Sequence, residues 1–123
     1  MLYEVMVTKN TKTLAERCKK AVSFTDRLVG LIGKSDFPTG EGVWFPHCND
    51  IHMWFMKMPI DVVFLREEKD SGTYRVTRVV PGLKPWGILP TMSLKATDVI
   101  ELPVGTIQKC EVKIGDQVCI SSK

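Results

Sequence analysis

Residues 59–65 read Pro59-Ile60-Asp61-Val62-Val63-Phe64-Leu65, and this run is the clearest strand pattern in the chain. Its apolar residues occupy both alternating sets of positions, which is typical of a strand buried on both faces of a sheet. Asp61 breaks the pattern, because a buried carboxyl needs a partner or must keep its proton. We expect an ion pair with Arg27, Lys57 or His52, hydrogen bonds from backbone N–H groups, or a place in a binding or reaction site.

Short strand patterns separated by turns extend from this run in both directions. Residues 9–12 predict the turn of an opening hairpin, and residues 67–72 predict a polar hairpin turn. Residues 81–92, with three prolines, predict a long irregular loop. A Gly115-Asp116 turn precedes the final strand. The strands that we expect cover roughly residues 3–8, 13–22, 42–45, 51–56, 60–65, 74–80, 99–102 and 117–120.

One segment has helical periodicity instead. Ser23 and Asp26 have the spacing of a capping box, and Gly33 would end the helix. The apolar residues that would share one helical face are Phe24, Leu28, Leu31 and Ile32. We predict one short helix near residues 24–32 and about eight short strands, which together indicate a mainly β (α+β) fold, a compact antiparallel barrel-like or sandwich domain.

Length and composition bound the class of protein. The 123 residues fit one domain spanning residues 1–123, and 44% hydrophobic with 25% charged residues exclude intrinsic disorder. The longest uncharged run, residues 85–94, is about half the length of a membrane-spanning helix, and residues 1–5 do not resemble a secretory signal. We expect a cytoplasmic protein with reduced thiols and no membrane contact. A net charge of +3 permits contact with a polyanion without requiring it, and we do not favour nucleic acid as a partner.

Acid/base chemistry is one interpretation of the buried acids. The motifs of nucleotide-binding loops, hydrolase nucleophile elbows and zinc proteases do not occur in the sequence. Glu101 is a second acid within an apolar strand pattern. If Glu101 and Asp61 converged, the pKa of one carboxyl would be raised, as an acid/base pair requires. His52 would then supply the proton, and Lys57 or Arg27 would stabilise developing negative charge.

Three side chains of metal-binding type lie close together in the sequence: His47, Cys48 and His52. Positions 47 and 52 differ by an odd number, so they would point to opposite faces of an extended chain unless a turn at Asn49-Asp50 intervened. We expect satisfied polar residues here rather than a metal site, and we predict no cofactor.

Large aromatic and methionine side chains gather between residues 44 and 58. Such side chains are usually core, but they also line the mouths of β-barrels that hold ligands. Trp86 lies in the predicted irregular loop and is either a rim residue or part of the core. The candidate pocket residues are Trp44, Trp54, Phe55, Met56 and Trp86.

Five motifs follow one another along the chain: Arg27-Leu28-Val29-Gly30-Leu31-Ile32, Gly42-Val43-Trp44-Phe45, the run from Cys48 to Leu65, Val99-Ile100-Glu101-Leu102-Pro103-Val104-Gly105, and Gly115-Asp116. Together they resemble the prokaryotic family catalogued as domain of unknown function 192, over about residues 14–120. The resemblance implies a compact, mostly β domain. It implies no activity, because that family has no established substrate, reaction or cofactor. Its recurrent polar positions are matched here by Arg27, His52, Lys57, Asp61 and Glu101, without a catalytic role.

Three functions are consistent with these features. We expect first a non-catalytic binding or accessory module whose Trp- and Met-lined pocket, gated by Arg27, Lys57 and Asp61, holds a small polar or anionic ligand. The alternative is an acid/base hydrolase or lyase in which Asp61 or Glu101 is the general base and His52 the acid. A third interpretation is a protein interaction domain that uses an exposed strand edge. The sequence leaves the oligomeric state open.

Overall fold

The residues that the structure describes contain nine strands and one helix. The computed structural model describes residues 2–21, 36–51, 58–69, 72–84 and 91–123. The elements are β1 (Leu2–Val7), β2 (Thr13–Lys20), β3 (Glu41–Pro46), β4 (Asp50–Ile51), β5 (Ile60–Glu67), β6 (Thr73–Leu83), β7 (Thr91–Met92), β8 (Asp98–Pro103), α2 (Thr106–Cys110) and β9 (Gln117–Ser122).

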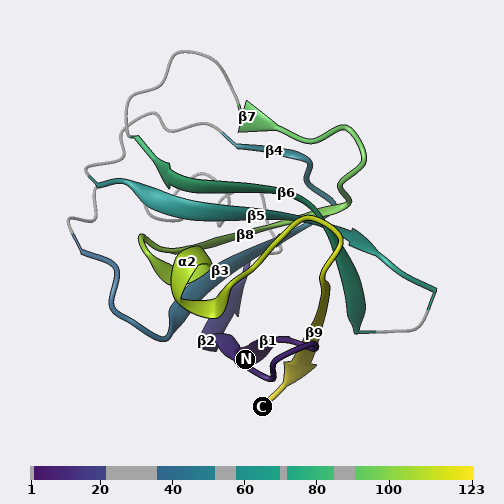
Figure 1. Ribbon diagram of the computed structural model, residues 1–123, viewed down its shortest axis with the longest axis horizontal. Helices are drawn as coiled ribbons and strands as arrows, with labels where there is room; N and C mark the ends of the chain where they lie inside the picture. The colour runs from purple at the N-terminus through teal and green to yellow at the C-terminus, as the bar shows by residue number, and fades with distance from the viewer. Residues whose placement is uncertain (1, 22–35, 52–57, 70–71, 85–90) are drawn as a thin grey trace.

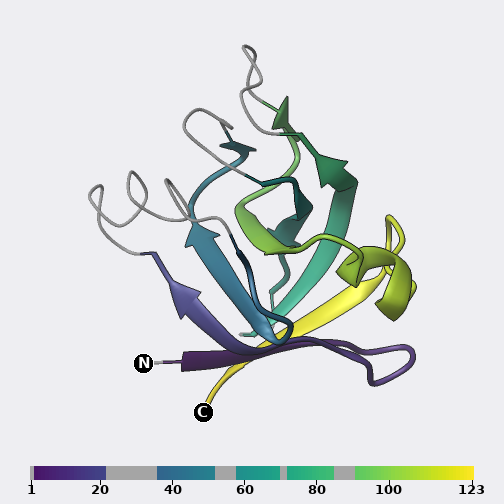
Figure 2. The same ribbon diagram turned by 90° about the vertical axis from the view of Figure 1, so that its left-hand side faces the viewer.

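Seven of the strands close into a barrel in the order β1-β2-β3-β8-β5-β6-β9, while β4 and β7 form a separate two-stranded sheet (Figure 1). The prediction of a mainly β, barrel-like domain is confirmed. β1 and β9 are antiparallel neighbours, so the two ends of the described chain lie close together (Figure 2). Among the described residues, no helix is long and apolar enough to span a bilayer.

The barrel sheet is mixed rather than purely antiparallel. β2 and β3 run parallel, with Arg17 beside Glu41 and Lys20 beside Trp44, whereas the other neighbouring pairs are antiparallel. The expectation of an antiparallel sheet is therefore wrong for this one pair. Parallel neighbours need a long crossover connection, which residues 21–40 provide. The helix predicted near residues 24–32 lies outside the described residues, as does most of the strand expected at 51–56.

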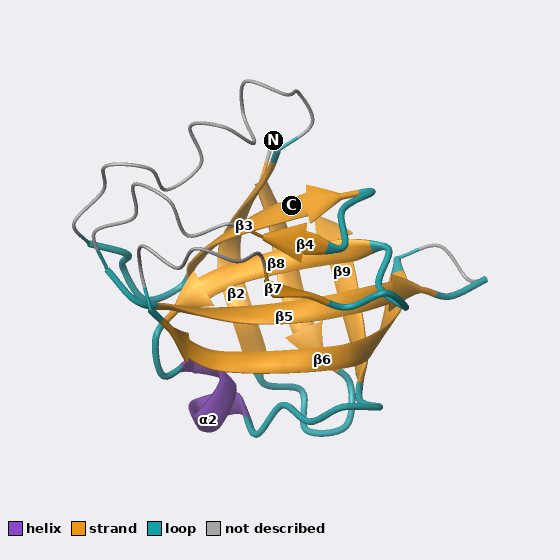
Figure 3. Ribbon diagram, turned by 90° about the horizontal axis from the view of Figure 1, so that it is seen from above, coloured by secondary structure: helices purple, strands orange, loops and turns teal. Residues whose placement is uncertain are grey.

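β5 is the central strand of a wall that is buried on both faces. It pairs with β6 on one side and with β8 on the other (Figure 3). Val63 and Leu65 belong to an apolar cluster with members on all seven barrel strands, which therefore fills the interior. Ile60, Val62 and Phe64 belong to a second cluster, whose strand residues come mostly from β3, β5 and β8 and which lies outside the barrel. The continuous apolar run of β5 reflects these two cores.

The structure corrects the two ends of the irregular loop that was expected at residues 81–92, while residues 85–90 lie outside the described residues. β6 continues to Leu83, which pairs with Ile60, and β7 occupies Thr91–Met92. The register between β5 and β6 shifts between Ile60 and Val62, so β6 accommodates Pro81 and Gly82 as a bulge rather than ending there. Proline content alone therefore misplaced the end of this strand, because a bulged edge strand tolerates proline.

Asp61 holds three segments together at one end of the barrel. Its side chain is 1% exposed and points to the barrel interior. Oδ1 accepts a hydrogen bond from the backbone N–H of Gly82 at 2.9 Å, and Oδ2 accepts bonds from Gly105 at 3.1 Å and Ile107 at 2.8 Å. Gly82 and Gly105 both have positive φ, a conformation that favours glycine. The sequence left several kinds of partner for Asp61 open. Among the described residues, its partners are backbone N–H groups.

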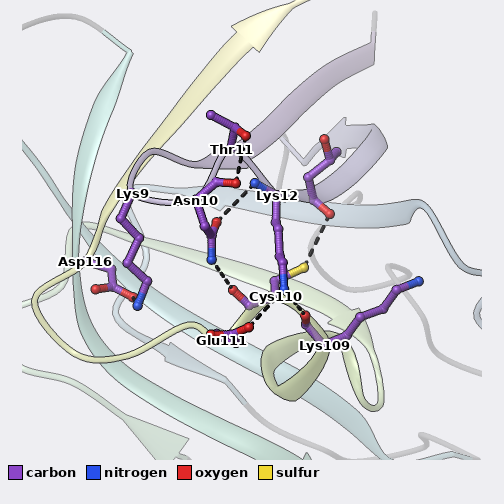
Figure 4. Close-up of polar contacts among 9 residues, drawn as sticks. Lys9, Asn10, Thr11, Lys12, Lys109, Cys110, Glu111 and Asp116 are labelled. Carbon is purple, nitrogen blue, oxygen red and sulfur yellow. Dashed lines mark hydrogen bonds and ion pairs between the residues drawn. The ribbon is translucent and has the colours of Figure 1, made fainter.

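The helix α2 was not indicated by the sequence pattern, because five residues are too few to establish a helical period. Ile107 and Cys110 are buried and join the interior cluster, so α2 covers part of the barrel core. Asn10 in the β1–β2 turn donates from Nδ2 to the carbonyl of Cys110 at 3.0 Å, and Lys12 contacts Glu111 at 3.0 Å (Figure 4). These contacts fix the C-terminal end of α2 against the predicted turn at residues 9–12.

Replacement of Asp61 by asparagine tests the role of these bonds. An amide can turn one oxygen toward the N–H groups but must turn its own N–H₂ toward the others, which leaves buried donors without acceptors. We expect Asp61→Asn to lower the free energy of unfolding by roughly 1 to 3 kcal/mol, as measured by urea denaturation. Glu16→Gln, on the exposed face of β2, is the control and should change stability by less than about 0.5 kcal/mol. An unchanged stability for Asp61→Asn would contradict the structural role.

Candidate functional site

The two buried acids of the predicted acid/base pair lie on opposite faces of the barrel wall. In the pairing of β5 with β8, Asp61 is opposite Leu102, and Glu101 is opposite Val62. Successive side chains of a strand point to opposite faces, so Asp61 and Leu102 face the interior while Glu101 and Val62 face outward. The clusters agree, because Leu102 lies in the interior cluster and Val62 in the outer one. The structure therefore does not bring Asp61 and Glu101 together.

Glu101 lies at the centre of an apolar outer wall. Its neighbours across the strands are Val43 on β3 and Val62 on β5, and the next outward residues along β8 are Val99 and Pro103. The side chain is 5% exposed. Among the described residues no hydrogen-bond or ion-pair partner is found for its carboxyl.

Burial among these side chains changes the acidity of Glu101. Desolvation raises its pKa from 4.5 to about 8, because the charged form loses hydration and gains no compensating partner. Glu101 therefore carries its proton at neutral pH and presents one O–H donor and one C=O acceptor. A carboxyl buried in this way destabilises a fold unless a partner satisfies it, so such groups are typical of binding and reaction sites.

Trp44 lies inside the barrel rather than in a pocket wall. It is 7% exposed, belongs to the interior cluster, and makes edge-to-face contacts with Tyr3 and Tyr74. The Nζ atom of Lys20 lies 4.7 Å from the centre of its ring, a cation–π contact. Trp44 pairs with Ile100, one position away from the Val43–Glu101 pair, so its side chain points away from Glu101. The sequence allowed Trp44 to be part of the core or part of a pocket wall, and in the structure it is part of the core.

Asp98 is a buried acid that the sequence analysis missed. It is 5% exposed, and its Oδ2 accepts the indole N–H of Trp44 at 2.7 Å while Oδ1 accepts the hydroxyl of Thr97 at 2.6 Å. The negative charge of Asp98 adds to burial in raising the pKa of Tyr74. The sequence signal that could have identified Asp98 is its position directly before the apolar residues of β8. Since its partners satisfy both oxygens, Asp98 differs from Glu101 and serves the core.

The metal-binding types near residue 47 do not form a metal site in the described part of the chain. No group of three His, Cys, Asp or Glu side chains that could hold a metal occurs there. His47 is exposed with a φ of 55°, and Cys48 donates from Sγ to the carbonyl of Asp50 at 3.0 Å. These residues line an open depression of about 390 Å³ with Ala96 and Thr97. It lies at the β4 end of the domain and does not include Glu101.

Seven of the predicted site residues lie outside the described residues, so their expected roles stay predictions. They are Arg27, His52, Trp54, Phe55, Met56, Lys57 and Trp86.

Comparisons with known proteins identify relatives but no activity. Residues 5–120 match the model of the DUF192 family, described as "Uncharacterized ACR". A Novosphingobium aromaticivorans protein of unknown function has a similar structure, with a TM-score of 0.77 and 20% identity over 96% of this chain and 83% of that one. A Sinorhizobium meliloti protein called a "putative transcription regulator" has a TM-score of 0.77 and 19% identity over 94% and 89%. At these identities the likeness shows the fold alone. No curated protein matches the chain.

The acidity of Glu101 predicts a pH dependence of stability. Below about pH 4.5 the carboxyl is protonated in the folded and the unfolded chain, and above about pH 8 it is ionised in both. Between these values only the folded chain keeps the proton, so rising pH favours unfolding. We expect this carboxyl to lower the free energy of unfolding between pH 4.5 and 8, by up to roughly 5 kcal/mol.

The comparison of variants isolates this contribution. Glu101→Gln keeps the shape of the side chain without a titrating proton, so its urea-denaturation stability should exceed that of the wild type above pH 8 and fall less with rising pH. Glu4→Gln, on β1 across the barrel, leaves Glu101 in place and should keep the wild-type pH dependence. Equal pH dependence in Glu101→Gln and the wild type would show that the buried carboxyl does not titrate as described.

Proposed function

Because the chain belongs to the DUF192 family, whose description assigns no activity, we propose a function from the geometry: a binding module for a small polar molecule, held on the outer wall around Glu101. The wall is formed by β3, β8 and β5. We expect this module to act in the cytoplasm, where its four cysteines would stay reduced thiols.

One observation carries this proposal, namely a carboxyl that is 5% exposed in an apolar wall and has no partner among the described residues. In Asp61 and Asp98, the other two buried acids of the described residues, both carboxyl oxygens accept hydrogen bonds. Around Glu101, Val62 and Val99 are 0% exposed. The partly buried side chains of Val43, Val80 and Leu83 pack against the same outer cluster. An apolar wall with a single polar group is the usual composition of a small-molecule site.

An acid/base enzyme is less well supported by this geometry. The alternative needed Asp61 and Glu101 in one site, whereas the barrel wall separates their side chains. Asp61 is also occupied by three backbone N–H groups. A general base must reach the proton that it abstracts and must be free to accept it. Glu101 has no second acid beside it among the described residues, so it can supply a binding contact but not the two groups of an acid/base pair.

Strand addition at an exposed edge is also less well supported. Gln117–Cys119 of β9 pair with β6 at Thr73–Arg75, so beyond Val76 the outer edge of β6 meets no further strand among the described residues. β6 contains two register shifts in its pairing with β5, and Pro81 on this strand is exposed. Bulges and proline are devices by which proteins prevent pairing at an edge, because they twist the strand and remove N–H donors.

Binding is tested with four probes that share one ring and differ in the polar group: benzamide, benzyl alcohol, benzylamine and benzoate. Fragments of this size reach dissociation constants on the order of 1 mM. We expect at least one probe to cause saturable shifts of the methyl NMR signals of Val43, Val62 and Val99. Glu101→Val should weaken that binding by about tenfold or more, since it removes the polar contact and keeps an apolar strand residue.

The matched control is Glu4→Val on β1, which removes an acid from the opposite side of the barrel and should leave the shifts unchanged. Glu101→Val should also raise the melting temperature, because it replaces an unsatisfied carboxyl by a strand-forming apolar residue. The proposal fails if none of the four probes shifts these methyl signals at millimolar concentration, or if Glu101→Val binds them as the wild type does.

A further inference from the structure

The segment that contains β7 presents two large apolar side chains to solvent. Leu94 is 82% exposed, more than any other large apolar side chain of the described residues, and Met92 is 40% exposed. Residues 91–95 lie beside β5 and β6 on the outside of the barrel (Figure 3). An exposed leucine is common on protein surfaces, so the surroundings of Leu94 decide whether it belongs to a binding surface.

Three hydrogen bonds hold this segment in place. Arg66 donates from Nη1 to the carbonyl of Lys95 at 3.2 Å, and Arg78 donates from Nη1 to the carbonyl of Met92 at 2.6 Å. The backbone N–H of Ser93 donates at 3.0 Å to the carbonyl of the residue before β4. A segment that is already ordered loses little conformational entropy when a partner covers it.

The two arginines that hold the segment have no acidic partner in the described part of the chain. Arg66 and Arg78 are exposed, and neither takes part in an ion pair there. A guanidinium has five N–H donors, and the bonds to the segment use one donor of each arginine. Lys95 is also exposed and without an ion pair among these residues. Three cations therefore surround Leu94 with donors left for a partner.

The strand register places a further arginine beside them. Arg66 is directly opposite Arg75 in the pairing of β5 with β6, and Arg78 is opposite Phe64, two positions from Arg66 on the same face. Like charges in opposite positions destabilise a sheet. Glu68 compensates Arg75, at 3.0 Å from Nη2, but makes no ion pair with Arg66 or Arg78. A partner that brings negative charge would relieve this repulsion.

One acid borders these cations in the described structure. Asp50 is opposite Met92 in the pairing of β4 with β7. Glu67, beside Arg66 in sequence, is opposite the interior residue Tyr74 and so belongs to the other face of β5. The cations and the apolar pair together form what we call the Leu94 surface, which consists of Arg66, Arg78, Met92, Leu94 and Lys95. Its charge is positive even with Asp50 included.

We propose that the Leu94 surface binds an acidic segment of another protein, in which carboxylates flank a large apolar side chain. Carboxylates accept paired hydrogen bonds from guanidinium groups, so they fit Arg66 and Arg78. The apolar side chain of the partner would cover Leu94 and Met92. This surface includes no part of the wall around Glu101, so the proposal is independent of the small-molecule site.

Two other anionic partners fit the surface less well. Single-stranded nucleic acids are bound through aromatic side chains on which bases stack, whereas the apolar members of the Leu94 surface are a leucine and a methionine. Membrane surfaces are bound by long amphipathic helices with a wide apolar face, whereas this segment exposes two apolar side chains. A protein segment supplies charge and apolar contact on the same scale as the surface.

The probe is a short peptide rich in glutamate and leucine, capped at both ends and titrated into the whole chain by NMR. We expect a dissociation constant on the order of 0.1 to 1 mM, with shifts at Met92, Leu94 and Lys95. Two matched peptides carry glutamine for every glutamate or serine for every leucine, and each should bind about fivefold more weakly or worse. Binding of the first peptide should weaken severalfold between about 0.02 M and 0.5 M salt.

Two variants of the surface have matched controls elsewhere in the protein. Leu94→Ser and Arg66→Gln should each weaken the glutamate- and leucine-rich peptide about fivefold or more. Leu94→Ser should keep the wild-type melting temperature, because the side chain is exposed. The controls are Ile114→Ser, at a side chain that is 66% exposed beyond α2, and Arg17→Gln, at an exposed arginine that also donates to a backbone carbonyl. Both controls should bind the peptide as the wild type does.

Four results would overturn the proposal. They are no binding of the glutamate- and leucine-rich peptide at about 1 mM, equal binding of the matched peptides, wild-type binding by Leu94→Ser, and wild-type binding by Arg66→Gln with a lowered melting temperature. The last would show that the arginine serves only to hold the segment. Tighter binding of oligothymidine or of phosphatidylglycerol vesicles, weakened by the same variants, would assign the surface to a nucleic acid or a membrane and would also overturn it.

Discussion

The three hydrogen bonds to Asp61 are the constraint on which one end of the barrel depends. A single carboxyl on β5 joins the bulge of β6 to the first residues of α2. The donors lie at two positions of positive φ, Gly82 and Gly105, and at Ile107, which packs into the interior. Because the carboxyl satisfies N–H groups that would otherwise be buried without partners, its burial is favourable. An acid committed in this way is not available to gate a pocket.

The wall formed by β3, β8 and β5 separates two environments with different chemistry. On the inner face, polar groups such as Asp98 and the indole of Trp44 satisfy each other. On the outer face, Glu101 stands among valines with no partner in the described structure. The same strand, β8, carries both acids, and the alternation of its side chains sends them to opposite sides. Asp98 and Glu101 are equally buried, but only Asp98 has hydrogen-bond partners among the described residues. The presence of partners therefore separates a core acid from a candidate binding group better than burial does.

The sequence analysis succeeded where a residue pattern has one structural cause. The run from Ile60 to Leu65 is apolar at successive positions because β5 is buried between two cores, and few other arrangements produce that pattern. It was ambiguous for Trp44, because an aromatic side chain on a strand has the same local sequence in a core as in a pocket. It failed at Pro81, where proline suggested a loop but a bulge continues the strand.

The sequence by itself determined the approximate positions of the seven barrel strands, the barrel-like class and the presence of two acids in apolar surroundings, because these follow from alternation and local propensity. Only the tertiary structure decided that β2 and β3 pair in parallel, that Asp61 meets backbone amides from residues 82, 105 and 107, and that Glu101 faces the other way. These facts depend on register between segments far apart in the chain. A shift of one residue in that register would exchange the two faces of every strand, and no local pattern records it.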